Sequence, residues 1–110
     1  MAYDEDLADR IRGAVQHVGG VTEKPMFGGL AFLIGGNLAV AASGQGGVML
    51  RCDPSQTDEL ARTDGVARMV MRGREMDGWL RIAPDVVATD EALQRWVDVG
   101  VGYAGSLPPK

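Results

Sequence analysis

Residues 26–43, MFGGLAFLIGGNLAVAAS, hold two short apolar runs, with one Gly-Gly pair between the runs and another before the first. Nearly continuous apolar runs of this length are typical of central strands that are covered on both faces. A glycine pair accepts the positive φ angles that a two-residue hairpin turn requires. The stretch therefore predicts a β-hairpin, with strands at Leu30–Ile34 and Leu38–Ala42 and a turn at Gly35-Gly36.

Glycine-rich segments also bind phosphates, but the sequence lacks the Gly-x-x-x-x-Gly-Lys-Ser/Thr string of a P-loop. A G-x-G-x-x-G string occurs once, at Gly100–Gly105, within a helical pattern. A dinucleotide site needs a strand before such a string and a helix N-terminus after it, and neither is predicted here. We interpret the string as the glycine-rich end of a helix and expect no cofactor.

The segments around the hairpin predict one domain, residues 1–110, with an α+β fold. Apolar spacings of three and four residues favour an N-terminal helix at Asp4–Val18 and a C-terminal helix from Thr89 to about Ala104. The string Asp53–Gln56 is typical of a helix start and predicts a short middle helix. Further strands complete a mainly antiparallel sheet of five to six strands and are expected at Val21–Phe27, Gly47–Cys52, Val66–Arg72 and Trp79–Ala83.

Composition limits the compartment and the partners. The net charge is −4, whereas nucleic acids and anionic membranes attract a surplus of Lys and Arg, so both are disfavoured. The N-terminal MAYDEDLADR is acidic where a signal peptide would be basic, and no apolar run approaches the ~20 residues that span a bilayer. Cys52 is the only cysteine, so no intramolecular disulfide is expected. These features predict a cytoplasmic protein.

Candidate catalytic and metal-binding residues are few. His17 and Cys52 are the only members of their types, so we expect no metal site of clustered Cys and His. We interpret His17 as a surface residue at a helix end and Cys52 as a small core residue, with a Cys–His dyad as the less favoured alternative. The acidic run Asp4–Asp6 fits helix capping better than cation binding. We therefore predict no catalytic, cofactor-binding or metal-binding residues.

Methionine is unusually frequent in the predicted strands and their connections. Gap-filling in the core is its commoner use, and a soft binding surface is the alternative. The residues concerned are Met26, Met49, Met69, Met71 and Met76.

Residues 66–82 hold four arginines against two carboxylates, a local surplus of positive charge. Strand alternation predicts that Arg68, Arg72, Trp79 and Arg81 share one face, opposite a side formed by Met, Leu and Ile. Arg and Trp are enriched at protein-binding hot spots, and Arg binds phosphate. Our hypothesis is that this face docks a protein partner or a phosphorylated ligand. The alternative is a solvated face whose arginines pair with local acids.

Several short strings occur in a fixed order: Tyr3–Ala8, Val21–Lys24, Met26–Gly29, the glycine-turn hairpin, Met49–Arg51, Gly78-Trp79 and Ser106–Lys110. In this order they resemble the N-terminal domain of the TfoX/Sxy family of bacterial competence regulators. The resemblance covers nearly the whole chain. It implies an α+β domain with an antiparallel sheet and flanking helices, and it implies no catalytic residues.

The sequence favours a non-enzymatic, cytosolic accessory or regulatory domain that binds a protein. One alternative is a nucleic-acid-associated transcriptional regulator that uses the Arg-bearing sheet face. Another is a small RNA-modifying enzyme whose site is assembled from scattered residues. An exposed strand edge near Pro25 would permit a homodimer, and no membrane association is expected.

Overall fold

The predicted hairpin forms two inner strands of the sheet in the computed structural model, which describes residues 3–26 and 28–110. Its strands are β2 (Gly29–Ile34) and β3 (Asn37–Ala42). The turn residues Gly35 and Gly36 have φ angles of 59° and 84°. Positive φ at both positions is the geometry of a two-residue hairpin turn, so this prediction is confirmed.

In the described ranges, six strands form one antiparallel sheet in the order β1-β2-β3-β4-β6-β5. The predicted α+β class is therefore confirmed. The other four strands are β1 (Val21–Met26), β4 (Val48–Arg51), β5 (Val66–Met71) and β6 (Arg74–Ile82). Phe27, predicted to end the first strand, lies outside the described residues.

Two boundaries differ by more than two residues from the sequence prediction. Strand β6 begins at Arg74 rather than Trp79, because Gly78 takes a φ of 83° and bends the strand without ending it. Helix α1 (Glu5–Ala14) stops short of Val18, and tighter turns follow, in which the N–H of Gln16 donates to Gly13 and that of Val18 to Val15. Fraying of the last helical turn into such bonds is common.

Two further helical elements begin where capping residues predict them. Asp53 and Thr89 accept hydrogen bonds from the N–H groups of Ser55 and Ala92, at 2.9 and 3.1 Å. These residues open a 3₁₀ turn, η1 (Pro54–Gln56), and the long helix α3 (Asp90–Ser106). The middle helix α2 (Thr57–Leu60) follows η1, and a second 3₁₀ turn, η2 (Pro84–Val87), precedes α3.

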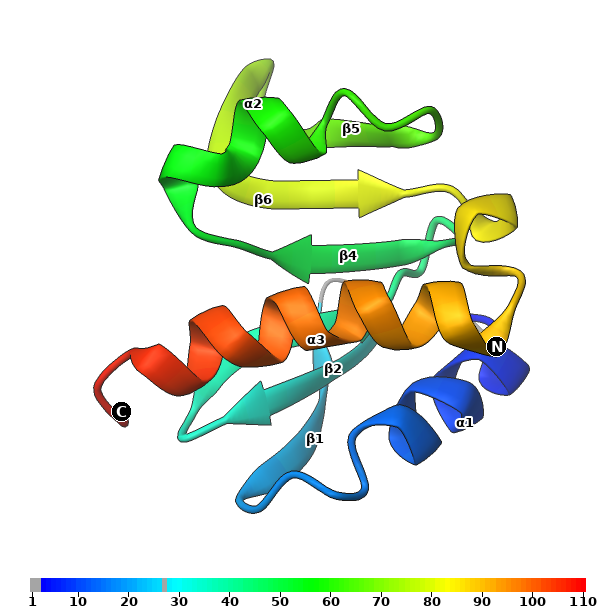
Figure 1. Cartoon of the computed structure of the whole chain (residues 1–110), viewed down its shortest axis with the longest axis vertical. Helices are drawn as coiled ribbons and strands as arrows, with labels where there is room; N and C mark the ends of the chain where they lie inside the picture. Colours follow the sequence, from blue (N-terminus) through cyan, green and yellow to red (C-terminus); the bar gives the residue numbers. More distant parts are fainter. Residues whose placement is uncertain (1–2, 27) are drawn as a thin grey trace.

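Helices α1, α2 and α3 lie on one side of the sheet, with α3 crossing in front of the central strands and α1 beside it (Figure 1). The core between these layers includes Ile11 of α1, Phe32 and Leu50 of the sheet, and Val97 of α3, each at most 1 % exposed. None of the helices in the described ranges combines the length and the hydrophobicity needed to cross a membrane.

The tail that follows α3 is bound to the hairpin turn. The N–H of Lys110 donates to the carbonyl of Gly35 at 2.7 Å, and the side-chain amide of Asn37 donates to the carbonyl of Pro108 at 3.0 Å. Asn37 is only 3 % exposed, so this bond satisfies a buried polar group. The tail therefore closes one end of the sheet, far in sequence from the strands that it contacts.

The turn between β5 and β6 contains the one non-glycine residue with positive φ in the described part of the chain, Arg72 at 53°. An L-residue other than Asn or Asp is strained in this region, and two-residue turns of this type prefer Asn-Gly. We therefore expect Arg72→Asn to raise the free energy of unfolding by about 0.5–1 kcal/mol. Urea unfolding measures the change, with Arg74→Asn as control. Equal midpoints for both variants would show that Arg72 carries no strain.

Candidate functional site

The residues predicted to share one partner-binding face lie on two sides of the sheet. In the β5–β6 register Ala67 pairs with Arg81, and Arg68 pairs with Leu80. Directly opposite residues share a face, so Arg68 lies on the helix side with buried Leu80, whereas Arg81 and Trp79 lie on the other side. The predicted single face is therefore wrong. Alternation within a strand divides its residues between two faces. Only the register between β5 and β6 shows which residues of the two strands lie on the same side of the sheet.

Arg68 is engaged by acidic side chains. It forms ion pairs with Asp58 of α2 and Asp77 of β6, and its side chain is 20 % exposed. The two carboxylates raise the pKa of Arg68 above its ordinary value. This arrangement matches the alternative in which the arginines pair with local acids. Of the other predicted residues, Arg81 hydrogen-bonds Gln45 and Arg72 lies in the exposed turn.

The ring of Trp79 contacts Arg51, an arginine that was not among the predicted site residues. The guanidinium of Arg51 lies 5.2 Å from the centre of the Trp79 ring and 5.5 Å from that of Tyr103, which comes from α3. Such distances allow cation–π attraction to both rings. Arg51 thus links the end of β4 to the C-terminal half of α3.

A second correction concerns the methionines. Met69 and Met71 lie with Trp79 on the helix-free side, not with Leu80 and Ile82, and they help to line a cavity of about 70 Å³. Its lining consists of Met49, Met69, Met71, Met76 and Trp79. Met49 is 6 % exposed and Met71 is 40 % exposed, so the cluster includes both core and surface positions.

The two residues of the alternative Cys–His dyad, Cys52 and His17, lie in different surroundings. Cys52 is completely buried, and its thiol lies 4.0 Å from the hydroxyl of Thr57. Burial raises the pKa of the Cys52 thiol, which disfavours the reactive thiolate. His17 is exposed in the turn after α1. No group of three or more metal-ligating side chains is found among the described residues.

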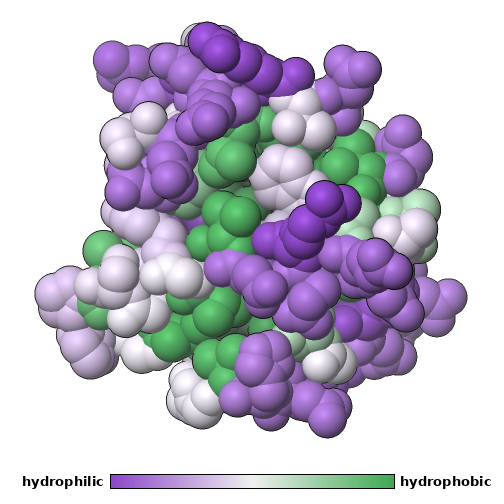
Figure 2. Space-filling view, viewed as in Figure 1, coloured by the Kyte–Doolittle hydropathy of each residue, from purple (hydrophilic) through white to green (hydrophobic). Residues whose placement is uncertain are grey.

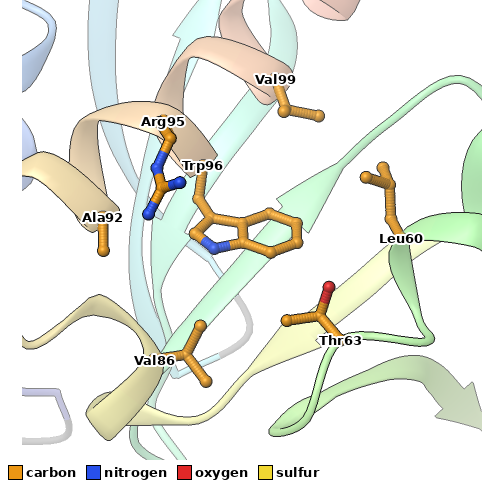
Figure 3. Close-up of a pocket in the computed structure, with 7 residues that line it drawn as sticks. All are labelled: Leu60, Thr63, Val86, Ala92, Arg95, Trp96 and Val99. Atoms are coloured by element: carbon orange, nitrogen blue, oxygen red, sulfur yellow. The ribbon is translucent and has the colours of Figure 1, made fainter.

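An apolar hollow lies on the helix side, between α3 and the segment formed by α2 and its following loop. Its volume is about 350 Å³, and Figure 2 shows hydrophobic surface in this region. In Figure 3 the Trp96 ring extends from α3 toward the side chains of Leu60, Thr63 and Val86. The complete lining is Leu60, Thr63, Val86, Ala92, Arg95, Trp96 and Val99.

This hollow was not predicted from the sequence. Trp96 belongs to the apolar stripe of α3, but it is only half-buried, whereas Leu93 and Val97 on the same helix are at most 2 % exposed. The sequence feature that points to this hollow is the width of the apolar stripe on α3. Val99 lies three residues beyond Trp96 and widens that stripe. The sheet covers only part of that face, and the rest lines the hollow.

A second, more polar hollow of about 340 Å³ adjoins the first and shares Val99 with it. It lies between η1 and the last turns of α3 and is lined by Asp53, Gln56, Asp98, Val99, Gly102, Tyr103 and Ser106. Hydrogen bonds from the Ser55 hydroxyl and N–H hold the pKa of Asp53 below its usual value, so this carboxylate is ionised at neutral pH. In the described ranges, neither Asp53 nor Asp98 forms an ion pair.

Together the two hollows form one surface, named here the α3 groove. Its apolar part contains Trp96 and Val99, Arg95 lies beside Trp96, and the acidic part contains Asp53 and Asp98. An apolar centre with polar groups at its margins is typical of sites that bind peptides or small molecules. The G-x-G-x-x-G string lies inside α3, as expected for a helix end, and Gly102 contributes to the groove wall.

Comparison with known proteins identifies one family. The model of the TfoX N-terminal domain matches residues 14–104, which is most of the chain. No curated protein and no solved structure matches.

Proposed function

The chain belongs to the TfoX N-terminal domain family, and from that premise we propose that it is a regulatory domain that binds a protein partner in the α3 groove. The observation that carries the proposal is the half-buried Trp96 in an apolar hollow of about 350 Å³. Tryptophan in such a hollow is typical of the residues that dominate protein-binding energies.

The charges along the groove favour a particular peptide chemistry. Asp53 and Asp98 would attract a Lys or Arg side chain of the partner, and Arg95 would attract a carboxylate. We therefore expect a segment with an apolar anchor over Trp96 and a basic residue on the side of Tyr103. Helix α3 has 17 residues and is ~25 Å long, enough to contact several residues of such a segment.

The cellular setting is also part of the proposal. The acidic charge and the single, buried cysteine support a cytosolic, non-enzymatic role related to competence regulation. Binding of nucleic acid through arginines ranks second, because Arg68 is paired with two carboxylates.

Blocking the groove tests the proposal. We expect Ala92→Arg, which fills the hollow without removing a core side chain, to weaken partner binding at least tenfold. The tagged protein is used to capture partners from the source cytosol with nuclease present, and the affinity of the captured protein is then measured by calorimetry. Arg81→Ala, on the helix-free side of the sheet, is the matched control.

Three outcomes are informative. Loss of binding in the Ala92 variant alone supports the α3 groove. Loss in the Arg81 variant alone contradicts it and moves the site to the other side of the sheet. Capture that disappears with nuclease and falls steeply with salt contradicts protein binding and favours nucleic acid.

A further inference from the structure

In the described part of the chain the sheet has two edge strands, and they differ in their protection against pairing with another chain. In β1, Pro25 lacks an N–H group, and Glu23 forms an ion pair with Arg12 at 2.6 Å. Proline and charged side chains are devices that natural edge strands use to prevent pairing. Strand β5 has no proline, and its one charged residue, Arg68, is held by Asp58 and Asp77 on the helix side. It is the last strand on its side of the sheet in the described part of the chain.

Strand β5 also carries unusual apolar exposure. Val70 and Met71 are 59 % and 40 % exposed, and they are the large hydrophobic residues found exposed in the described ranges. Both lie at the end of β5 that pairs with Arg74 and Glu75, a part of β6 that does not pair with β4. Unpaired backbone groups next to exposed apolar side chains form a template for strand addition.

The two ends of β5 carry opposite charges. Asp64 precedes the strand, and Arg72 follows it. Neither side chain forms an ion pair among the described residues, and both are exposed. An antiparallel second copy of the strand would bring the acidic end of each copy to the basic end of the other. The strand is therefore complementary in charge to itself.

We propose that β5 pairs with β5 of a second copy of this chain to form a two-fold symmetric dimer with a continuous sheet. The register centred on Met69 is favoured, because a register centred on Arg68 would place two guanidinium groups directly opposite each other. With Met69 at the centre, Met71 lies opposite Ala67 of the second copy, and Arg72 lies two residues from its Asp64. The side chains of Ala67, Met69 and Met71 all lie on the helix-free side of the sheet.

This pairing also gives a role to the cavity that Trp79 and the methionines line. Met69 and Met71 line the cavity of each copy, so the dimer joins two cavities of about 70 Å³ across the symmetry axis. Methionine adapts its shape readily, which suits a surface that packs against itself. The α3 groove lies on the opposite side of the sheet and remains free for the proposed partner.

Cysteine cross-linking tests the register. Met69→Cys would place two thiols opposite each other with Cβ atoms ~4.5–5.5 Å apart, close to disulfide distance. Cys52 is buried, so the new thiol is the accessible one. We expect a covalent dimer under mild oxidation, and none from Thr22→Cys on the β1 edge. Equal cross-linking of both variants, or none of Met69→Cys, would overturn the proposal.

A charge exchange tests the pairing independently. Asp64→Arg and Arg72→Asp each place like charges at both ends of the paired strands, and we expect each to weaken dimerisation about tenfold in sedimentation equilibrium. Asp is tolerated at the positive φ of position 72. The double variant exchanges both charges and is expected to restore the dimer. A wild-type protein that stays monomeric, or single variants that dimerise unchanged, would refute the inference.

Discussion

Replacing Gly100 by alanine is expected to lower the free energy of unfolding by about 2–3 kcal/mol, although alanine is the better helix former. A Cβ at this position would lie 2.4 Å from the carbonyl oxygen of Ala39 and 2.7 Å from Cδ1 of Leu50. Real Cβ atoms do not approach so closely, and the carbonyl belongs to the backbone of β3. Helix α3 must therefore move away from the sheet, which disrupts the central core.

The same helix provides a matched control. Gly102 is two residues further along α3, and a Cβ there would meet nothing within 4 Å. We expect Gly102→Ala to stabilise the protein by about 0.5–1 kcal/mol, because only the helix propensity changes. Urea unfolding of both variants gives the comparison. If Gly100→Ala were as stable as Gly102→Ala, the close contact between α3 and β3 would be wrong.

Replacing Thr57 by valine is expected to destabilise the protein by about 2–3 kcal/mol, although the two side chains have nearly the same shape. The Thr57 hydroxyl donates to the carbonyl of Pro54 at 2.8 Å and accepts from the N–H of Gly78 at 2.7 Å. Thr57 has no exposed surface, so valine would leave a buried N–H without a partner. This hydroxyl joins the start of α2 to the bend in β6.

A serine variant at position 57 distinguishes the contribution of the hydroxyl to stability from that of the methyl group. Thr57→Ser keeps both hydrogen bonds and is expected to lose only about 1 kcal/mol, for the missing methyl. Thermal unfolding of the three proteins measures the order of stability. A valine variant as stable as the serine variant would contradict the role of the hydroxyl. Since α2 carries Leu60, we also expect Thr57→Val to weaken binding in the α3 groove.

Local sequence determined the elements of this protein. The Gly35-Gly36 pair between two apolar runs specifies the hairpin, since the turn needs positive φ at both positions. Asp4, Asp53 and Thr89 specify where helical segments begin, because their side chains accept the N–H groups that a first turn leaves unpaired. These preferences act within a few residues, so the sequence alone predicts the α+β class.

Only the tertiary structure decided how these elements meet. The β5–β6 register separates Arg68 from Trp79 and Arg81, and it brings Met69 and Met71 to the side of Trp79. The α3 groove exists because the sheet covers Leu93 and Val97 but leaves Trp96 only half-buried. Registers and helix positions depend on packing between residues distant in sequence. No local pattern contains that information, so the faces of the elements were predictable but their partners were not.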